Sequence, residues 1–222
     1  MFLAIDTATH QVSLALHDGL SVIAEVSWRT ESYHSVELAP QTALLLRRSQ
    51  VDPARLSGLA VAIGPGSYTA LRIGLGLAKG LALAHGVPLC GVSTFDILMR
   101  AQPPAANKAI AVLQAGRHRI SVAPYRWQLP GAWEPAGDMR VLEWPMLADE
   151  LAAEADHPVF ICGEIDEAGR DSLRRLKDRV RVASPAQSLR RAGFLGEIGW
   201  ERLRHHRMDS AATLAPIYGG QA

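Results

Sequence analysis

Residues 64–86 place the strongest constraint on how this chain can fold, because they combine a tight turn with a long glycine-rich segment. The stretch opens with Gly-Pro-Gly, which permits a sharp reversal after the apolar run that precedes it. Ser67 or Thr69 can cap a helix, and Gly86 followed by Pro88 provides a stop signal. The sequence therefore predicts a buried strand, a turn and a helix over residues 69–85.

Small residues form two ridges along this predicted helix. Each interior glycine costs about 1 kcal/mol relative to alanine, so the glycines need a physical reason. The ridges, each at i, i+4 spacing, are Ala70, Gly74 and Ala78, and Gly76, Gly80 and Ala84. Bare ridges allow a second backbone to approach closely. A core helix, a partner interface and a phosphate cradle are the alternatives, and the cradle lacks both glycine motifs typical of phosphate loops. We expect core packing combined with a partner interface.

Composition limits the class of protein. The 222 residues can form one large domain or two small lobes with a substantial core. The net charge of +1 favours neither nucleic acid nor an anionic membrane. Arg72 and Lys79 interrupt the glycine-rich segment, which argues against a membrane span, and the N-terminus does not resemble a signal peptide. We expect a cytoplasmic protein in which Cys90 and Cys162 are buried thiols.

The order of predicted elements indicates two α/β lobes. The first half reads as a meander of strands at 2–5, 12–16 and 22–28, a helix at 35–48, a strand at 59–63, the glycine-rich helix, a strand at 89–92 and a helix at 94–101. Residues 102–107 form the best linker candidate. The second half reads as strands at 109–114, 120–125, 139–142 and 159–162, with helices near 145–155, 167–177 and 186–206. We expect lobes at 1–104 and 105–222.

Several motifs resemble those of a known family. Leu3-Ala-Ile-Asp-Thr-Ala-Thr9 followed by Val12-Ser-Leu-Ala-Leu16 resembles the first phosphate hairpin of the actin and sugar-kinase superfamily. A further set of motifs makes the chain similar to the TsaB family, also called YeaZ: His34-Ser35, Gly64-Pro-Gly-Ser-Tyr-Thr-Ala-Leu-Arg-Ile-Gly74, Ala78-Lys-Gly-Leu81, Gly91-Val-Ser93 and Pro216-Ile-Tyr218. The match is dense over residues 2–100.

The resemblance implies a two-lobe actin-like ATPase (RNase H-like) fold, with a mixed sheet and helices in each lobe. It also implies a scaffold subunit with no catalytic activity and no cofactor of its own. Its partners would be a TsaD-type catalytic subunit and a TsaE-type ATPase, with ATP or ADP at the partner boundary. That complex modifies adenosine 37 of tRNAs that read codons beginning with A. The resemblance further implies a homodimer when the chain is alone, and tRNA contact only through the complex.

In the family, helices that match residues 35–48 and 69–85 form the dimer surface. The expected interface residues are Val36, Leu71, Gly74, Leu75, Ala78 and Lys79. We therefore expect the substitution Gly74→Leu to leave the chain folded and to prevent partner binding.

The chain departs from the family pattern in two places. Leu113-Gln-Ala-Gly116 stands where relatives carry Ile-Asp-Ala-Arg, which removes a carboxylate at Gln114, and Gly219-Gly220 stands where relatives often continue with Leu-Arg. An active ATPase or kinase that uses Asp6 is the alternative function, because phosphoryl transfer requires carboxylates that hold Mg²⁺. Asp6 and Thr7 are the expected vestigial cofactor-binding residues. The structural interpretation is that Asp6 hydrogen-bonds its own turn.

Other catalytic interpretations find little support. The histidines lack the spacing of metal ligands, so no metal site is expected. Ser67 lies outside the Gly-x-Ser-x-Gly pattern of a hydrolase nucleophile, which disfavours a peptidase. The arginine-rich second half is interleaved with acids and is typical of a solvated surface, with a minor tRNA contact as the alternative.

Overall fold

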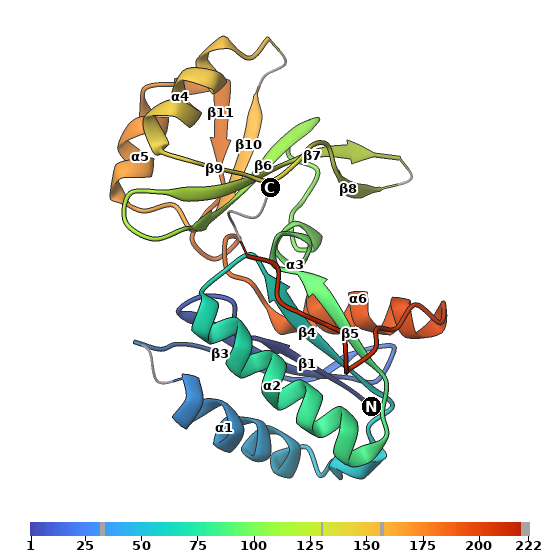
Figure 1. Ribbon diagram of the computed structural model, residues 1–222. Coiled ribbons are helices and arrows are strands. Elements are labelled where there is room, and N and C mark those ends of the chain that lie inside the picture. The colour runs from blue at the N-terminus through green and yellow to red at the C-terminus, as the bar shows by residue number, and fades with distance from the viewer. Residues whose placement is uncertain (32–33, 130, 156–157, 219–222) are drawn as a thin grey trace. The chain divides into compact units, whose positions relative to one another are not determined.

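The computed structural model describes residues 1–31, 34–129, 131–155 and 158–218, and the chain forms two compact units (Figure 1). The first unit contains Met1–Ile97 and Arg190–Tyr218, and the second contains Leu98–Leu189. This division corrects the expected boundary at residues 104 and 105. The physical reason is that the last helix of the chain packs on the first sheet, so residues 190–218 belong to the first unit.

A five-stranded sheet with the order β3-β2-β1-β4-β5 forms the centre of the first unit. Its strands are β1 (Phe2–Asp6), β2 (Gln11–His17), β3 (Val22–Arg29), β4 (Gly58–Gly64) and β5 (Leu89–Ser93). The expected meander of β1, β2 and β3 is antiparallel, with Ile5 opposite Leu14, whereas β4 and β5 run parallel to β1. Strands β1 and β4 are almost wholly buried because helices cover both faces of the sheet.

Helices α1 (His34–Arg48) and α2 (Tyr68–His85) lie side by side on one face of this sheet, and α6 (Ala192–Arg204) covers the other (Figure 1). The alternation of β1 explains the two layers. Leu3 and Ile5 belong to the apolar cluster that includes α1 and α2, whereas Phe2 and Ala4 belong to the cluster that includes α6. The side of α6 that packs on the sheet consists mainly of glycine and alanine. Gly199 gives the reason, because a Cβ there would overlap the Phe2 ring.

The second unit is built on a six-stranded sheet with the order β11-β10-β6-β7-β8, in which β9 also pairs with β7. Its strands are β6 (Lys108–Gln114), β7 (Ile120–Gln128), β8 (Ala132–Pro135), β9 (Arg140–Leu142), β10 (Val159–Gly163) and β11 (Val180–Val182). This unit also contains α4 (Trp144–Ala153), α5 (Glu167–Arg174) and the 3-10 turn η2 (Lys177–Arg179). The boundary between the units in the sequence falls inside α3 (Thr94–Arg100), and the 3-10 turn η1 (Pro53–Arg55) belongs to the first unit. Two mixed sheets with helices confirm the expected fold class.

Short edge strands and helix ends are where the sequence-based prediction was wrong. Strands β8 and β11 were not predicted, because four and three residues give too little alternation to detect. The last helix begins at Ala192, not near residue 186, and α5 ends at Arg174. The expected linker at 102–107 begins inside the second unit, because the Gln102 side-chain amide donates to the carbonyl oxygens of Leu98 and Gln187.

Both cysteines are buried free thiols, as predicted. Burial raises the pKa of the Cys90 and Cys162 thiols to about 12, so neither is a reactive thiolate near neutral pH. Within the described part of the chain, no helix is both long and apolar enough to cross a membrane.

Candidate functional site

The turn between β4 and α2 is packed between two other segments of the first unit. Gly64 has a φ of +115°, which favours glycine, and a Cβ there would overlap the carbonyl oxygen of Ile217. A Cβ at Gly66 would overlap the carbonyl oxygen of Ala8, and the Ser67 amide donates to that same oxygen at 2.7 Å. Ser67 caps α2, as predicted, because its Oγ accepts from the Ala70 amide. These contacts fix the start and direction of α2.

Asp6 and Thr7 lie fully buried at the end of β1. One carboxylate oxygen of Asp6 accepts from the Ala8 amide at 2.9 Å, and the other accepts from Arg190 Nε at 3.1 Å. The Thr7 hydroxyl donates to the Ala70 carbonyl oxygen at 2.7 Å and so binds α2. Both side chains therefore stabilise the β1–β2 turn and its neighbours.

Arg190 is the residue of this region that sequence analysis missed. Its side chain is only 2% exposed, and besides Asp6 it binds Thr9 Oγ1 at 2.6 Å and the Gln11 carbonyl oxygen at 3.3 Å, both through Nη2. In the sequence it is one arginine among many, separated from Asp6 by 184 positions. Only a three-dimensional structure reveals that pairing.

The first small-residue ridge of α2 packs inside the first unit. A Cβ at Gly74 would overlap the Thr7 hydroxyl and would lie 3.2 Å from Thr7 Cβ. Leu71, Leu75 and Ala78 are also buried in the apolar clusters of this unit. The interface expected at these four residues would therefore have to use positions that the fold of the first unit buries.

The second ridge, Gly76, Gly80 and Ala84, lies at the surface. A Cβ at Gly76 or at Gly80 would meet no other group within 4 Å. Two large apolar side chains of these helices are also exposed: Leu83 on α2 is 74% exposed and Val36 in the first turn of α1 is 68% exposed. Lys79, also expected at the interface, is half-buried.

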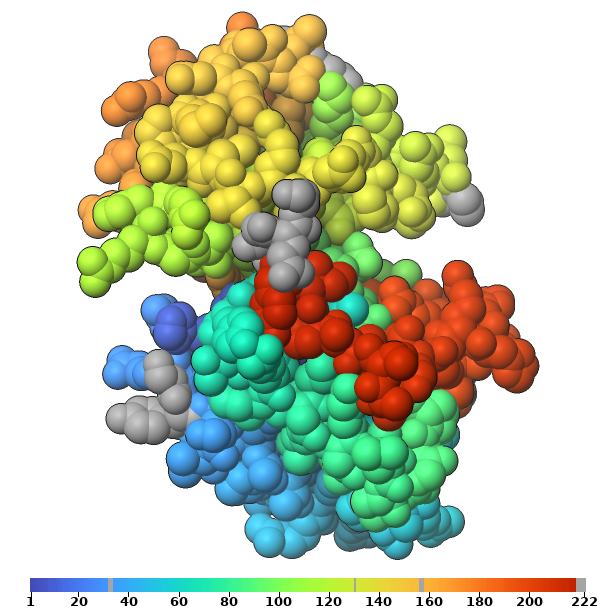
Figure 2. Space-filling view, in the orientation of Figure 1, coloured from blue at the N-terminus to red at the C-terminus, as the bar shows by residue number. Residues whose placement is uncertain are grey.

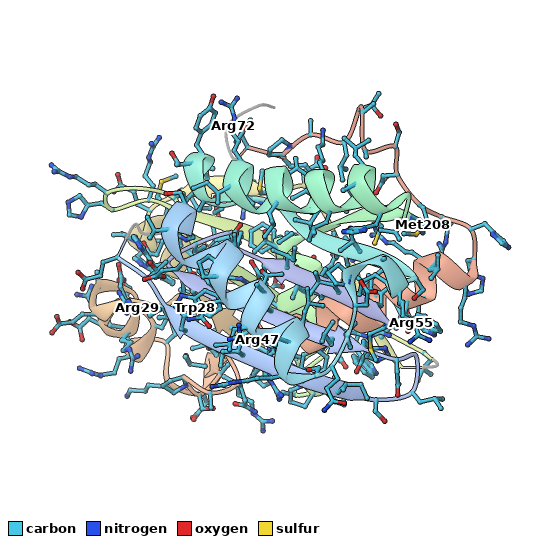
Figure 3. The ribbon with its side chains drawn as sticks, turned by 90° about the horizontal axis from the view of Figure 1, so that it is seen from below. Trp28, Arg29, Arg47, Arg55, Arg72 and Met208 are labelled. Atoms are coloured by element: carbon cyan, nitrogen blue, oxygen red, sulfur yellow. The ribbon has the colours of Figure 1, made fainter. Side chains whose placement is uncertain are left out.

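A shallow groove of about 320 Å³ runs between α1 and α2. It is lined by Ala39, Thr42, Ala43, Leu46, Arg47, Val51, Pro53, Leu77 and Leu81. Figure 3 views this side of the first unit, with α1 and α2 next to each other and Arg47 beside α1. We call this surface, formed by the groove, Val36, Leu83 and the Gly76–Gly80 ridge, the α1–α2 face. The groove at its centre is lined mainly by apolar side chains.

Basic side chains lie at the end of α1, where Arg47 and Arg48 form the last turn, and near the start of α2. Helix α2 contains no acidic residue, and the one carboxylate of α1, Glu37, accepts a hydrogen bond from Trp28 Nε1 at 2.9 Å. At the start of α2, the Arg72 guanidinium stacks 3.8 Å from the centre of the Tyr68 ring and donates to the Tyr218 hydroxyl at 2.9 Å. These contacts hold the C-terminal segment, red in Figure 2, against α2.

The other expected features concern the second unit, metal ligands and the C-terminal residues. At the end of β6, the side-chain amide of Gln114 donates to the Glu164 carbonyl oxygen, and the backbone amide of Gln114 donates to the Glu164 carboxylate. Among the residues that the structure describes, no group of three or more potential ligands could hold a metal ion. The expected departure at Gly219-Gly220 falls outside the described residues.

Comparisons with known proteins agree with this architecture. The family model described as TsaD, tRNA N6-adenosine threonylcarbamoyltransferase, matches residues 23–129. The solved structure described as YeaZ from Pseudomonas aeruginosa superposes with a TM-score of 0.79 at 25% identity over 98% of each chain. The ROK hexokinase from Thermus thermophilus superposes with a TM-score of 0.51 at 11% identity over 91% of this chain and 99% of that chain, which shows the shared actin-like fold alone.

A curated relative defines the family more closely. The tRNA threonylcarbamoyladenosine biosynthesis protein TsaB of Bacillus subtilis is 34% identical over 203 residues, which cover 90% of this chain and 87% of that protein. The sequence motifs, the fold and this similarity agree with one another. The chain belongs to the TsaB family.

Proposed function

We propose that this chain is a scaffold subunit that binds and activates a TsaD-type catalytic subunit. The reaction of that complex is N6-threonylcarbamoylation of adenosine 37 in tRNAs that read codons beginning with A. In this proposal a TsaE-type ATPase joins the complex, ATP or ADP binds at a partner boundary, and tRNA contacts the chain only within the assembly. Alone, the chain forms a homodimer and has no catalytic activity.

The exposed glycines of α2 carry the proposal. Gly74 is explained within the chain, because a side chain there would collide with Thr7. Gly76 and Gly80 have no such explanation, although each costs about 1 kcal/mol of helix stability relative to alanine. The presence of two such glycines on the surface of a helix is consistent with close approach by the backbone of another chain.

The rest of the α1–α2 face supports the same interpretation. The helices that form the apolar groove also carry the exposed side chains of Val36 and Leu83, and exposed apolar surface of this kind is typical of protein interaction sites. Arg47, at the end of α1, is exposed and lines the groove, so it can form part of a polar rim around the apolar centre. We therefore revise the expected interface to Val36, Ala39, Gly76, Gly80 and Leu83, with Lys79 at its margin.

An omission experiment tests the proposed function. Unmodified tRNA is incubated with threonine, bicarbonate, ATP, the enzyme that makes threonylcarbamoyl-adenylate, and the TsaD-type and TsaE-type subunits, with or without this chain. Modified adenosine is measured by mass spectrometry of digested tRNA. We expect modification to depend on the chain, and the chain without the TsaD-type subunit to form no product. Product formed by the chain alone, or an equal rate without the chain, would contradict the proposal.

A further inference from the structure

The buried pair of Asp6 and Arg190 has a geometry that selects one kind of cation. The Arg190 guanidinium meets acceptors through two of its nitrogens: Nε donates to the Asp6 carboxylate, and Nη2 donates to Thr9 Oγ1 and the Gln11 carbonyl oxygen. A planar group with several fixed donors matches such a set, whereas a lysine ammonium on a flexible stem does not.

A magnesium nucleotide, which the ATPase fold family implies beside Asp6, does not fit these residues. Mg²⁺ requires oxygen ligands at about 2.0–2.1 Å in octahedral geometry. One Asp6 oxygen is already bound to the Ala8 amide, and the other faces a guanidinium that carries a full positive charge. A second cation at this carboxylate would meet strong repulsion in a buried site, where charges are poorly screened.

We propose that Asp6, Thr9 and the Gln11 carbonyl form a guanidinium-binding cradle, which the chain fills with its own Arg190 in place of a divalent cation. We define the guanidinium cradle by these three residues. Arg190 is also the first residue of the segment that returns to the first unit. The cradle therefore anchors the chain where this segment begins.

The residues that follow Arg190 extend the anchor along β2 and β3. The Ala192 amide donates to Ser13 Oγ at 2.9 Å, and the Gly193 amide donates to a Glu25 carboxylate oxygen at 2.7 Å. Glu25 also accepts from Arg191 Nε at 2.8 Å. The guanidinium cradle is the buried end of this series, so its occupation positions the start of α6 on the sheet.

Chemical rescue of Arg190→Ala tests the proposal. The substitution leaves a buried carboxylate without its counter-ion, and we expect the melting temperature to fall by roughly 10 °C. Ethylguanidinium at low millimolar concentration should restore a large part of this loss. Ethylammonium, which has the same charge without the planar fork, should restore little, and MgCl₂ should restore none. The double variant Asp6→Asn/Arg190→Ala is the matched control and should not respond to ethylguanidinium.

Two further measurements keep the test decisive if Arg190→Ala does not fold. Arg190→Lys should keep the charge but lose most of the stability that Arg190 provides. Calorimetric titration with Mg·ATP should give the same result for the wild-type chain and for the Asp6→Asn variant, because we expect no Mg·ATP to bind at Asp6. Equal rescue by ethylammonium, rescue by Mg²⁺, full stability of Arg190→Lys, or Asp6-dependent binding of Mg·ATP would overturn the proposal.

Discussion

The substitution Gly80→Leu is expected to stabilise the isolated chain and to weaken its binding to a TsaD-type subunit at least about 30-fold. The isolated chain gains because leucine is the better helix former by about 1 kcal/mol, and a Cβ at this position meets no other group within 4 Å. Binding is weakened because a bulky side chain at the centre of the α1–α2 face would hold the partner backbone away. We expect a loss of at least about 2 kcal/mol, roughly 30-fold in affinity.

Urea unfolding and titration calorimetry measure these two effects separately. Gly80→Ala is the conservative control: it should gain a similar stability and lose less affinity than Gly80→Leu. If the Gly80→Leu variant bound the TsaD-type subunit with wild-type affinity, the interface with that subunit would not include Gly80. If Gly80→Leu instead destabilised the isolated chain, the new side chain would have to collide with other groups of the same chain.

The same substitution six residues earlier in the helix is expected to act in the opposite way. Gly74→Leu should destabilise the first unit by about 3 kcal/mol or more, because the new side chain collides with Thr7 and disrupts its hydrogen bond to Ala70. This expectation replaces the one drawn from sequence, in which Gly74→Leu leaves the chain folded. The measurement is the free energy of unfolding from urea titration followed by circular dichroism.

A compensating variant tests the cause of that loss. Gly74→Ala introduces only a Cβ, and Thr7→Ala removes the hydroxyl and methyl groups that this Cβ would meet. We expect the double variant to be more stable than the sum of the two single effects predicts, because residues in contact are coupled. Strict additivity, or a Gly74→Leu chain as stable as the wild type, would show that Gly74 does not pack on Thr7.

Local patterns predicted most elements of the fold. The alternation of β2 indicated a strand of the meander, and the unbroken apolar run of β4 indicated a buried strand. Ser67 and Gly86 marked the limits of α2 to within one residue. These features depend on neighbours in sequence, so a single chain contains enough information to predict them.

Features that depend on distant contacts could not be predicted. The two ridges of α2 have the same spacing and similar small residues, and only contacts from distant parts of the chain, such as that of Thr7 with Gly74, show which ridge faces the sheet. The return of α6 to the first unit depends on pairs such as Asp6 and Arg190, which are 184 positions apart. For its predicted partner surface, sequence analysis therefore selected mainly buried positions on α2.

Light scattering coupled to size-exclusion chromatography tests the central claim most directly. The 24.0 kDa chain is measured alone, then mixed with an equimolar TsaD-type subunit. We predict a dimer of this chain that is replaced by a 1:1 complex with the TsaD-type subunit, and less of this complex with Gly80→Leu. A chain that stays monomeric and elutes unchanged beside the TsaD-type subunit would contradict the claim that it is a scaffold.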